Sequence, residues 1–288
     1  MKLSVIQVPY DSGHYGDRMG RGPLHFVEHG LVDRLARHDR QVDLVEIRAA
    51  EGFFTELGRA VELQQQTHEA VARALAAGAL PVLLTGNCYL AALGTLSALP
   101  RGSTGVVWFD AHGDFNTPET SGSGFFDGMV LAMLTGRCWT GLAASMRSFK
   151  SVADEAVVLI GARDLDPEEE RLLVESRVSR VSVADLRGES SVALAVSSSL
   201  DRMPEEIDTI YLHVDLDVLD PSELRANPFA APGGLELDEL LGVIAAIGRK
   251  RRIGAVALTA YDPTGDEAER GLGVAETVLD AVFDEVDT

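Results

Sequence analysis

Two clusters of potential metal ligands follow strongly apolar stretches of the sequence. In the first cluster, Asp110, His112 and Asp114 occupy alternate positions directly after the apolar residues 105–109. An extended chain places every second side chain on the same side, so these three side chains are expected to point together. Two carboxylates and an imidazole suit a hard or borderline divalent cation. A turn with solvated acids and a capping histidine also explains this pattern.

The second cluster consists of Asp215 and Asp217, which follow the apolar residues 209–214. Paired buried acids repel each other and cost several kcal/mol unless a cation or a proton intervenes. Taken alone, such a pair is equally typical of capping or turn chemistry. Together the clusters supply four carboxylates and one imidazole. Their charge of about −4 balances two divalent cations, which two-metal sites hold about 3.5–4 Å apart.

Some residues near these clusters are interpreted first as packing residues. Cys88 follows the apolar residues 80–84 and the glycine turn at Gly86. A lone cysteine is ordinarily a small buried hydrophobic residue. His213, inside an apolar stretch, and Trp108, beside Asp110, are likewise expected to pack in the core.

These residues must be positioned by alternating strands and helices. Short apolar stretches rich in branched side chains predict eight buried strands, at residues 3–8, 41–47, 80–84, 105–109, 156–160, 178–183, 209–214 and 253–258. Helical periodicity lies between several of them, at residues 61–77, 237–247 and 268–283. This alternation predicts an α/β fold with one doubly wound parallel sheet. Ligands of such sheets bind beyond the carboxyl ends of the strands, and long loops at 10–23, 115–128 and 220–234 are expected to contribute.

The composition excludes several classes of partner. The 288 residues include 25 Lys and Arg against 45 Asp and Glu, a net charge of −20. Nucleic acids and anionic membrane surfaces are poor partners, because binding them requires clustered cations. The longest apolar stretch, near residues 74–84, is shorter than the ~18 residues of a membrane span. Two cysteines form no disulfide framework and no signal segment is evident, so a cytoplasmic location is expected.

The motifs resemble those of the ureohydrolases, the family of arginases, agmatinases and formiminoglutamases. The family pattern D-A-H-x-D is similar to residues 110–114, D-x-D-x-x-D-P to residues 215–221, and G-G-D-H to residues 85–88. The resemblance covers most of the chain and implies a single three-layer α/β/α domain over residues 1–288, with an eight-stranded parallel sheet. It also implies two manganese ions, a metal-bridging hydroxide that attacks a guanidinium or similar carbon, and a trimer or hexamer.

The resemblance further implies which residues bind the metals. The ligands would be Asp110, His112, Asp114, Asp215 and Asp217, and Cys88 stands where the family has another histidine ligand. A thiolate is softer than an imidazole and favours zinc or iron over manganese. The resemblance therefore leaves the identity of the ion at Cys88 open.

Other matched segments imply how a substrate is bound. Asn116 and Ser123 correspond to residues that contact the α-carboxylate of the amino acid in arginase. Asp164 and Asp166 lie in a segment similar to the arginase stretch G-L-R-D-V-D-P-x-E, in which the second aspartate helps to receive the α-amino group. An N-cap for a helix beginning at Pro167 also explains these aspartates.

The chain departs from the arginase pattern at two more positions. Asp127 replaces the proton-shuttling histidine, and we expect it to act as the catalytic acid or base if burial raises its pKa. Asp114 is the other expected catalytic residue. Ala260 replaces the glutamate that binds the guanidinium, so a charge-assisted contact is lost. N-hydroxyarginine or a formimino compound is therefore at least as good a candidate substrate as L-arginine.

The sequence thus predicts a binuclear metal-dependent hydrolase that cleaves a linear C–N bond in a guanidino or modified-guanidino, amino-acid-like substrate. The changes at Cys88, Asp127 and Ala260 leave a non-catalytic relative open, acting as a metal-binding or oligomeric scaffold. A formimino- or amide-type hydrolase of the same fold is a further alternative. A deacetylase of a related fold is disfavoured by the arginase-like segments 116–118 and 164–169.

Overall fold

A parallel β-sheet lies at the centre of the computed structural model, which describes residues 1–288 apart from 38, 53, 147–148, 189–191, 267–269 and 287–288. The sheet has eight strands in the order β4-β1-β5-β10-β9-β6-β7-β8. Each predicted strand agrees within two residues at either end, so the predicted fold is confirmed. The strands are β1 (Lys2–Val8), β4 (Gln41–Glu46), β5 (Leu80–Thr85), β6 (Thr104–Phe109), β7 (Val157–Ile160), β8 (Ser179–Val181), β9 (Thr209–Asp215) and β10 (Arg252–Thr259).

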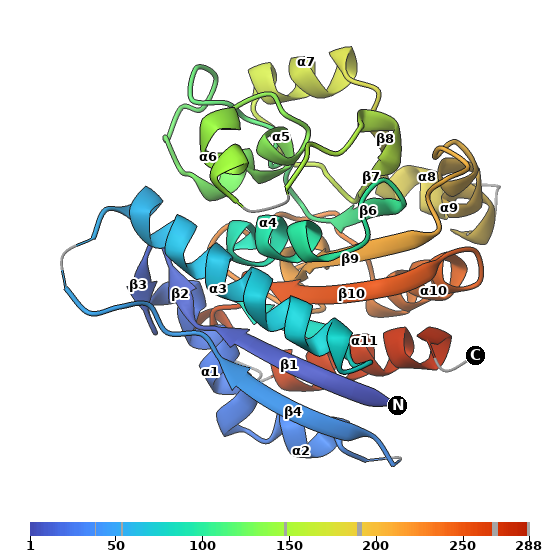
Figure 1. Cartoon of the computed structure of the whole chain (residues 1–288). Helices are drawn as coiled ribbons and strands as arrows, with labels where there is room; N and C mark the ends of the chain where they lie inside the picture. Colours follow the sequence, from blue (N-terminus) through green and yellow to red (C-terminus); the bar gives the residue numbers. More distant parts are fainter. Residues whose placement is uncertain (38, 53, 147–148, 189–191, 267–269, 287–288) are drawn as a thin grey trace.

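Helices cover both faces of the sheet (Figure 1). On one face lie α3 (Glu56–Ala76) and α4 (Cys88–Ala98), and on the other α10 (Leu237–Gly248) and α11 (Gly271–Val286). Residues 268 and 269 of the predicted last helix lie outside the described residues. No described helix has both the length and the apolar character that crossing a membrane requires. The other helices are α1 (Arg21–Glu28), α2 (Leu31–Leu35), α5 (Val130–Leu134), α6 (Thr140–Ser145), α7 (Pro167–Glu175), α8 (Val183–Arg187) and α9 (Val192–Asp201), with short 3-10 turns at Arg18–Gly20, Asp127–Met129, Asp154–Ala156, Leu216–Val218 and Pro263–Gly265.

Successive strand residues fill two apolar cores. On β6, Val106 and Trp108 face α3 and α4, whereas Val107 and Phe109 belong to the core beneath α10 and α11. This explains why the central strands are apolar throughout rather than alternating. The burial of β4 differs from that of the central strands. It lies at the edge of the sheet, where it pairs with β1 along one side and has no described strand on the other. Leu44 is 41% exposed, so the expectation of a buried strand there was wrong.

A small hairpin occupies the loop predicted at residues 10–23. Its strands, β2 (Tyr10–Asp11) and β3 (His14–Tyr15), are antiparallel and too short to leave a periodic pattern in the sequence. The turn after β5 approaches this hairpin closely, since a Cβ atom at Gly86 would lie 2.2 Å from the Tyr10 carbonyl oxygen. Gly86 therefore allows the loop and the start of α4 to meet at one end of the sheet.

An ion pair joins the segment after α5 to the short turn before β7. Arg137 donates to Asp154 through Nη1–Oδ1 at 2.7 Å and Nη2–Oδ2 at 2.6 Å, and its guanidinium lies over the Phe115 ring. These hydrogen bonds lower the pKa of Asp154. Ionised Asp154 therefore stabilises the fold above its unfolded pKa, and this contribution is lost as the pH falls through the lowered native pKa.

We expect Asp154→Asn to reduce the free energy of unfolding by about 1–2 kcal/mol near pH 7, because it removes a charge-assisted pair. Urea unfolding of both proteins measures this difference, which should narrow below about pH 4. The control is Asp201→Asn, in the more exposed pair with Lys250, and it should change stability little. A difference that is independent of pH would contradict the assignment.

Candidate metal centre

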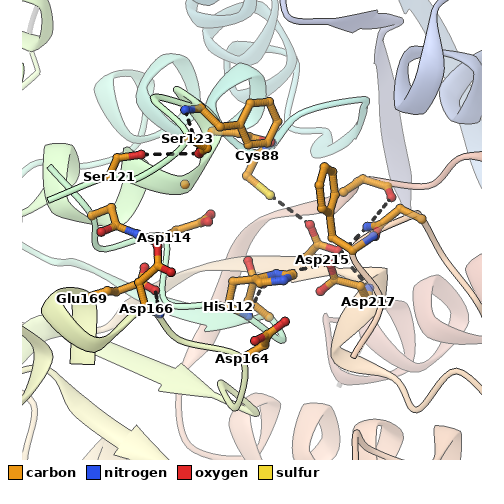
Figure 2. A pocket seen from close by; sticks show the side chains of 18 of the residues that line it. Cys88, His112, Asp114, Ser121, Ser123, Asp164, Asp166, Glu169, Asp215 and Asp217 are labelled. Atoms are coloured by element: carbon orange, nitrogen blue, oxygen red, sulfur yellow. Dashed lines mark hydrogen bonds and ion pairs between the residues drawn. The ribbon is translucent and has the colours of Figure 1, made fainter. Parts of the chain in front are cut away.

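The predicted ligands meet at the carboxyl ends of β5, β9 and β6, with β10 lying between β5 and β9. Cys88 begins α4 after β5, Asp110 follows β6, and Asp215 ends β9. Because parallel strands end at the same edge of the sheet, segments distant in sequence line one pocket of about 420 Å³. Figure 2 shows the Cys88 sulfur directed at Asp215, with His112 and Asp217 beside them. The predicted ligands lining this pocket are Cys88, Asp110, His112, Asp114, Asp215 and Asp217.

The ligand atoms form two adjoining groups in the described part of the chain. Those of Cys88, Asp110 and Asp215 lie within 4.8 Å of one another, as do those of Asp110, His112 and Asp217. Asp110 belongs to both groups. The His112 Nδ1 atom is 3.1 Å from Asp110 Oδ1 and 3.4 Å from Asp217 Oδ2. Two ions bound to these groups would thus have Asp110 in common as a ligand.

Asp114 lines the same pocket and carries an unpartnered buried atom. Its Oδ2 has no hydrogen-bond partner among the described residues. Its backbone is in the left-handed region at φ 49°, where Leu131 N–H donates to its carbonyl oxygen at 2.8 Å. A buried carboxylate oxygen without a partner is costly, and a cation in the pocket would relieve that cost.

The electrostatics of the cluster also favour a bound cation. Burial and then the charges of neighbouring aspartates raise the pKa values of Asp110, Asp114 and Asp215. Burial lowers the pKa of His112, but the hydrogen bond to Asp110 and the charge of Asp217 outweigh it and raise the pKa to about 10. The described residues lining the pocket include no Lys or Arg. Carboxylates, an imidazole and a thiol form a donor set that fits divalent ions, whose binding releases the protons of His112 and Cys88.

Comparison with known proteins identifies the family. The model of the Arginase family matches residues 1–283. The chain belongs to the arginase family. It is 28% identical to an arginase of Bacillus caldovelox over 98% of each chain, and 30% identical to an N(omega)-hydroxy-L-arginine amidinohydrolase of Streptomyces lavendulae over 79% of this chain and 78% of that protein. The crystal structure of arginase from Bacillus cereus matches with a TM-score of 0.87 at 25% identity, over 98% of each chain. The resemblance drawn from the motifs is confirmed.

The predicted substrate-binding residues of this arginase-family chain line the same pocket. Asn116 Nδ2 donates to Asp166 Oδ2 at 3.1 Å, and Ser123 Oγ accepts from Phe125 N–H at 3.1 Å. Asp164 lines the pocket beside them, and Figure 2 shows Asp166 on its wall. Asp166 is also the N-cap of α7, so the capping interpretation is confirmed for Asp166 but not for Asp164, which lies two residues before the cap. An apolar wall completes the pocket, formed by Met19, Phe125 and Phe229.

Arg163 holds the backbone around Asp217, a role that sequence reasoning missed. The feature of the sequence that could have indicated this role is the position of Arg163 in the arginase-like segment that also holds Asp164 and Asp166. Because carbonyl oxygens have no formal charge, Arg163 forms several hydrogen bonds here rather than an ion pair. These hydrogen bonds fix the loop that carries the candidate ligand Asp217. It donates to the carbonyl oxygens of Gly161, Asp217, Val218, Leu219, Ala231 and Pro232.

Asn227 is a second supporting residue that sequence reasoning missed, although its loop at residues 220–234 was expected to contribute. Its Nδ2 donates to Asp217 Oδ2 at 3.1 Å and to the Ala260 carbonyl oxygen at 2.9 Å. Ala260 has a left-handed backbone at φ 57° and lines the pocket. Asn227 therefore couples the orientation of a ligand to the pocket wall.

Asp127 lines the pocket and also anchors the start of α4. Its Oδ1 accepts from Tyr89 N–H at 2.9 Å, and its Oδ2 accepts from Cys88 N–H at 3.1 Å and from Asn87 Nδ2 at 3.0 Å. Burial raises its pKa to about 7, although the hydrogen bonds from Tyr89 and Cys88 oppose this. The carboxylate thus satisfies amide groups at a helix N-terminus, where negative charge is favourable.

We expect Asp127→Asn to lower the free energy of unfolding by about 2 kcal/mol, because an amide NH₂ would face an N–H donor. Urea unfolding of the metal-free protein measures this loss. Asp164→Asn is the matched control. Asp164 lines the same pocket, but among the described residues it makes no hydrogen bond to α4. Unchanged stability of Asp127→Asn would contradict an anchoring role.

Proposed function

We propose that the chain is a binuclear metal-dependent hydrolase that cleaves a linear C–N bond in a guanidino or modified-guanidino, amino-acid-like substrate. The observation that carries this proposal is the meeting of the acidic clusters with His112 and Cys88 in one pocket of an arginase-family chain. Similarity to proteins named arginase and N(omega)-hydroxy-L-arginine amidinohydrolase supports the substrate class.

In this proposal the two adjoining ligand groups each hold an ion. Cys88 and Asp215 belong to one group, His112 and Asp217 to the other, with Asp110 between them. A divalent pair supplies a water molecule activated as a nucleophile near neutral pH. Manganese suits the oxygen-rich groups, and the thiol also admits zinc or iron.

The remaining pocket residues would orient the substrate and carry protons. Asp164 and Asp166 offer carboxylates to a substrate ammonium group, and Asn116 and Ser123 offer polar groups to its carboxylate. Asp127 is proposed to protonate the leaving amine. Its pKa of about 7 lets it hold a proton in part of the population near neutral pH.

The pocket wall favours a modified guanidine or a formimino compound over free L-arginine. Ala260 lines the pocket where the family pattern has a glutamate, and a methyl group cannot accept hydrogen bonds from a guanidinium. The test is a substrate panel of L-arginine, Nω-hydroxy-L-arginine, agmatine and N-formimino-L-glutamate. Release of urea, hydroxyurea, ammonia and formamide distinguishes the reactions.

We expect Asp114→Ala and Asp215→Ala to lose bound metal and more than about 100-fold in kcat/KM, because each removes a buried candidate ligand. Elemental analysis and the product assays measure both losses. Asp201→Ala, in an exposed ion pair, is the control and should keep metal and turnover. Full turnover by either site variant would contradict the mechanism. A metal-loaded wild type that hydrolyses none of the panel would favour the non-catalytic alternative.

We also propose that the protein is a homo-oligomer, a trimer or a hexamer, and acts in the cytoplasm. The motif resemblance supports the assembly, and the cysteine content supports the location. Light scattering coupled to size-exclusion chromatography measures the assembly. A monomer at micromolar concentration would contradict this part of the proposal.

A further inference from the structure

A buried chain of hydrogen bonds lies beneath the candidate ligands. The Tyr211 hydroxyl is 2.8 Å from His213 Nδ1, and His213 Nε2 is 3.2 Å from Thr259 Oγ1. Thr259 Oγ1 is in turn 3.2 Å from Cys88 Sγ and 3.4 Å from Asp215 Oδ2. All these residues are buried, so the chain runs from the core to the metal centre without contact with solvent.

The hydrogen-bond donors in this chain all point toward the ligands. Among the described residues, His213 is the hydrogen-bond partner recorded for the Tyr211 hydroxyl, so Tyr211 donates to Nδ1. A neutral imidazole then carries its proton on Nε2 and donates to Thr259 Oγ1. The hydroxyl proton of Thr259 is left to point at Cys88 or Asp215. The opposite direction would leave the buried tyrosine proton without an acceptor.

A stacked tryptophan holds the imidazole in this orientation. The Trp108 and His213 rings lie 3.5 Å apart at an angle of 3°, on paired positions of β6 and β9. Trp108 Nε1 also donates to Asp110 Oδ2 at 3.1 Å. The ring plane is therefore fixed on the same face of the sheet as the ligands, and Nε2 is held toward Thr259.

We propose that Thr259, oriented by His213, is a positioning residue that donates its hydrogen bond to the Cys88 sulfur when that sulfur binds a divalent ion. The inference rests on the metal centre of the proposed function. A hydroxyl donor stabilises the negative charge on a sulfur ligand, and outer partners of this kind change metal affinity about 10–100-fold. Thr259 thereby favours an ion that accepts sulfur at this position.

Cobalt binding tests this role without any turnover assay. Co²⁺ bound to a thiolate gives a near-ultraviolet sulfur-to-metal charge-transfer band, which Cys88→Ser should remove. We expect Thr259→Val to bind Co²⁺ about tenfold more weakly and to move the band to longer wavelength, because the sulfur loses its donor. Thr259→Ser keeps the hydroxyl and should behave as wild type. Thr95→Val, which removes a buried hydroxyl without a described partner, is the control for lost polarity.

Tyr211→Phe tests the direction of the chain and remains informative if Thr259→Val does not fold. Without the tyrosine proton, His213 can carry its proton on Nδ1 and accept from Thr259, so the band should again move to longer wavelength. Wild-type affinity and band position in both variants would overturn the inference, as would Thr259→Ser behaving like Thr259→Val. Absence of the band in wild type would overturn it too, whereas the hydrolase proposal stands or falls separately by product release.

Discussion

Repulsion between buried carboxylates is the constraint on which the rest of this structure depends. Asp110, Asp114, Asp215 and Asp217 are all nearly inaccessible to solvent. Burial raises the pKa values of Asp110, Asp114 and Asp215. Buried like charges are unfavourable without cations or protons, so the folded chain must hold them together by other interactions. The parallel sheet provides this, because its central strands end at one edge and their packed faces leave the side chains little freedom.

The surrounding hydrogen bonds oppose the same repulsion. Arg163 fixes the carbonyl groups of the loop after Asp217, and Asn227 donates to the carboxylate itself. Trp108 donates to Asp110 from inside the sheet. Each donor stabilises a ligand in a set orientation before any ion binds, which lowers the conformational entropy that binding must remove. The site is thus organised by backbone and core contacts rather than by its ligands alone.

The sheet and the main ligand motifs were predictable because each leaves a local pattern. Apolar β-branched stretches mark β6 and β9, and acids at alternate positions follow them directly. Asn227 and Thr259 leave no such pattern, because their roles depend on pairing between segments distant in the sequence. The same holds for His213, where the sequence indicated a packed core residue. That interpretation is confirmed, yet its hydrogen bonds toward Thr259 appear only when β9 and β10 are side by side.

Two departures from the family pattern, Cys88 and Asp127, are in direct contact. Asp127 accepts from the Cys88 backbone N–H, and Thr259 Oγ1 lies against the Cys88 sulfur. Cys88, which replaces a histidine of the family pattern, is therefore held through both its backbone and its side chain. A histidine at position 127 could not replace this anchor, because a neutral imidazole has one acceptor nitrogen. Asp127 accepts with both oxygens, from Asn87, Cys88 and Tyr89. The aspartate therefore anchors the backbone of Cys88 and Tyr89, where α4 begins. Removal of the Asp127 carboxylate would leave these buried N–H groups without an acceptor.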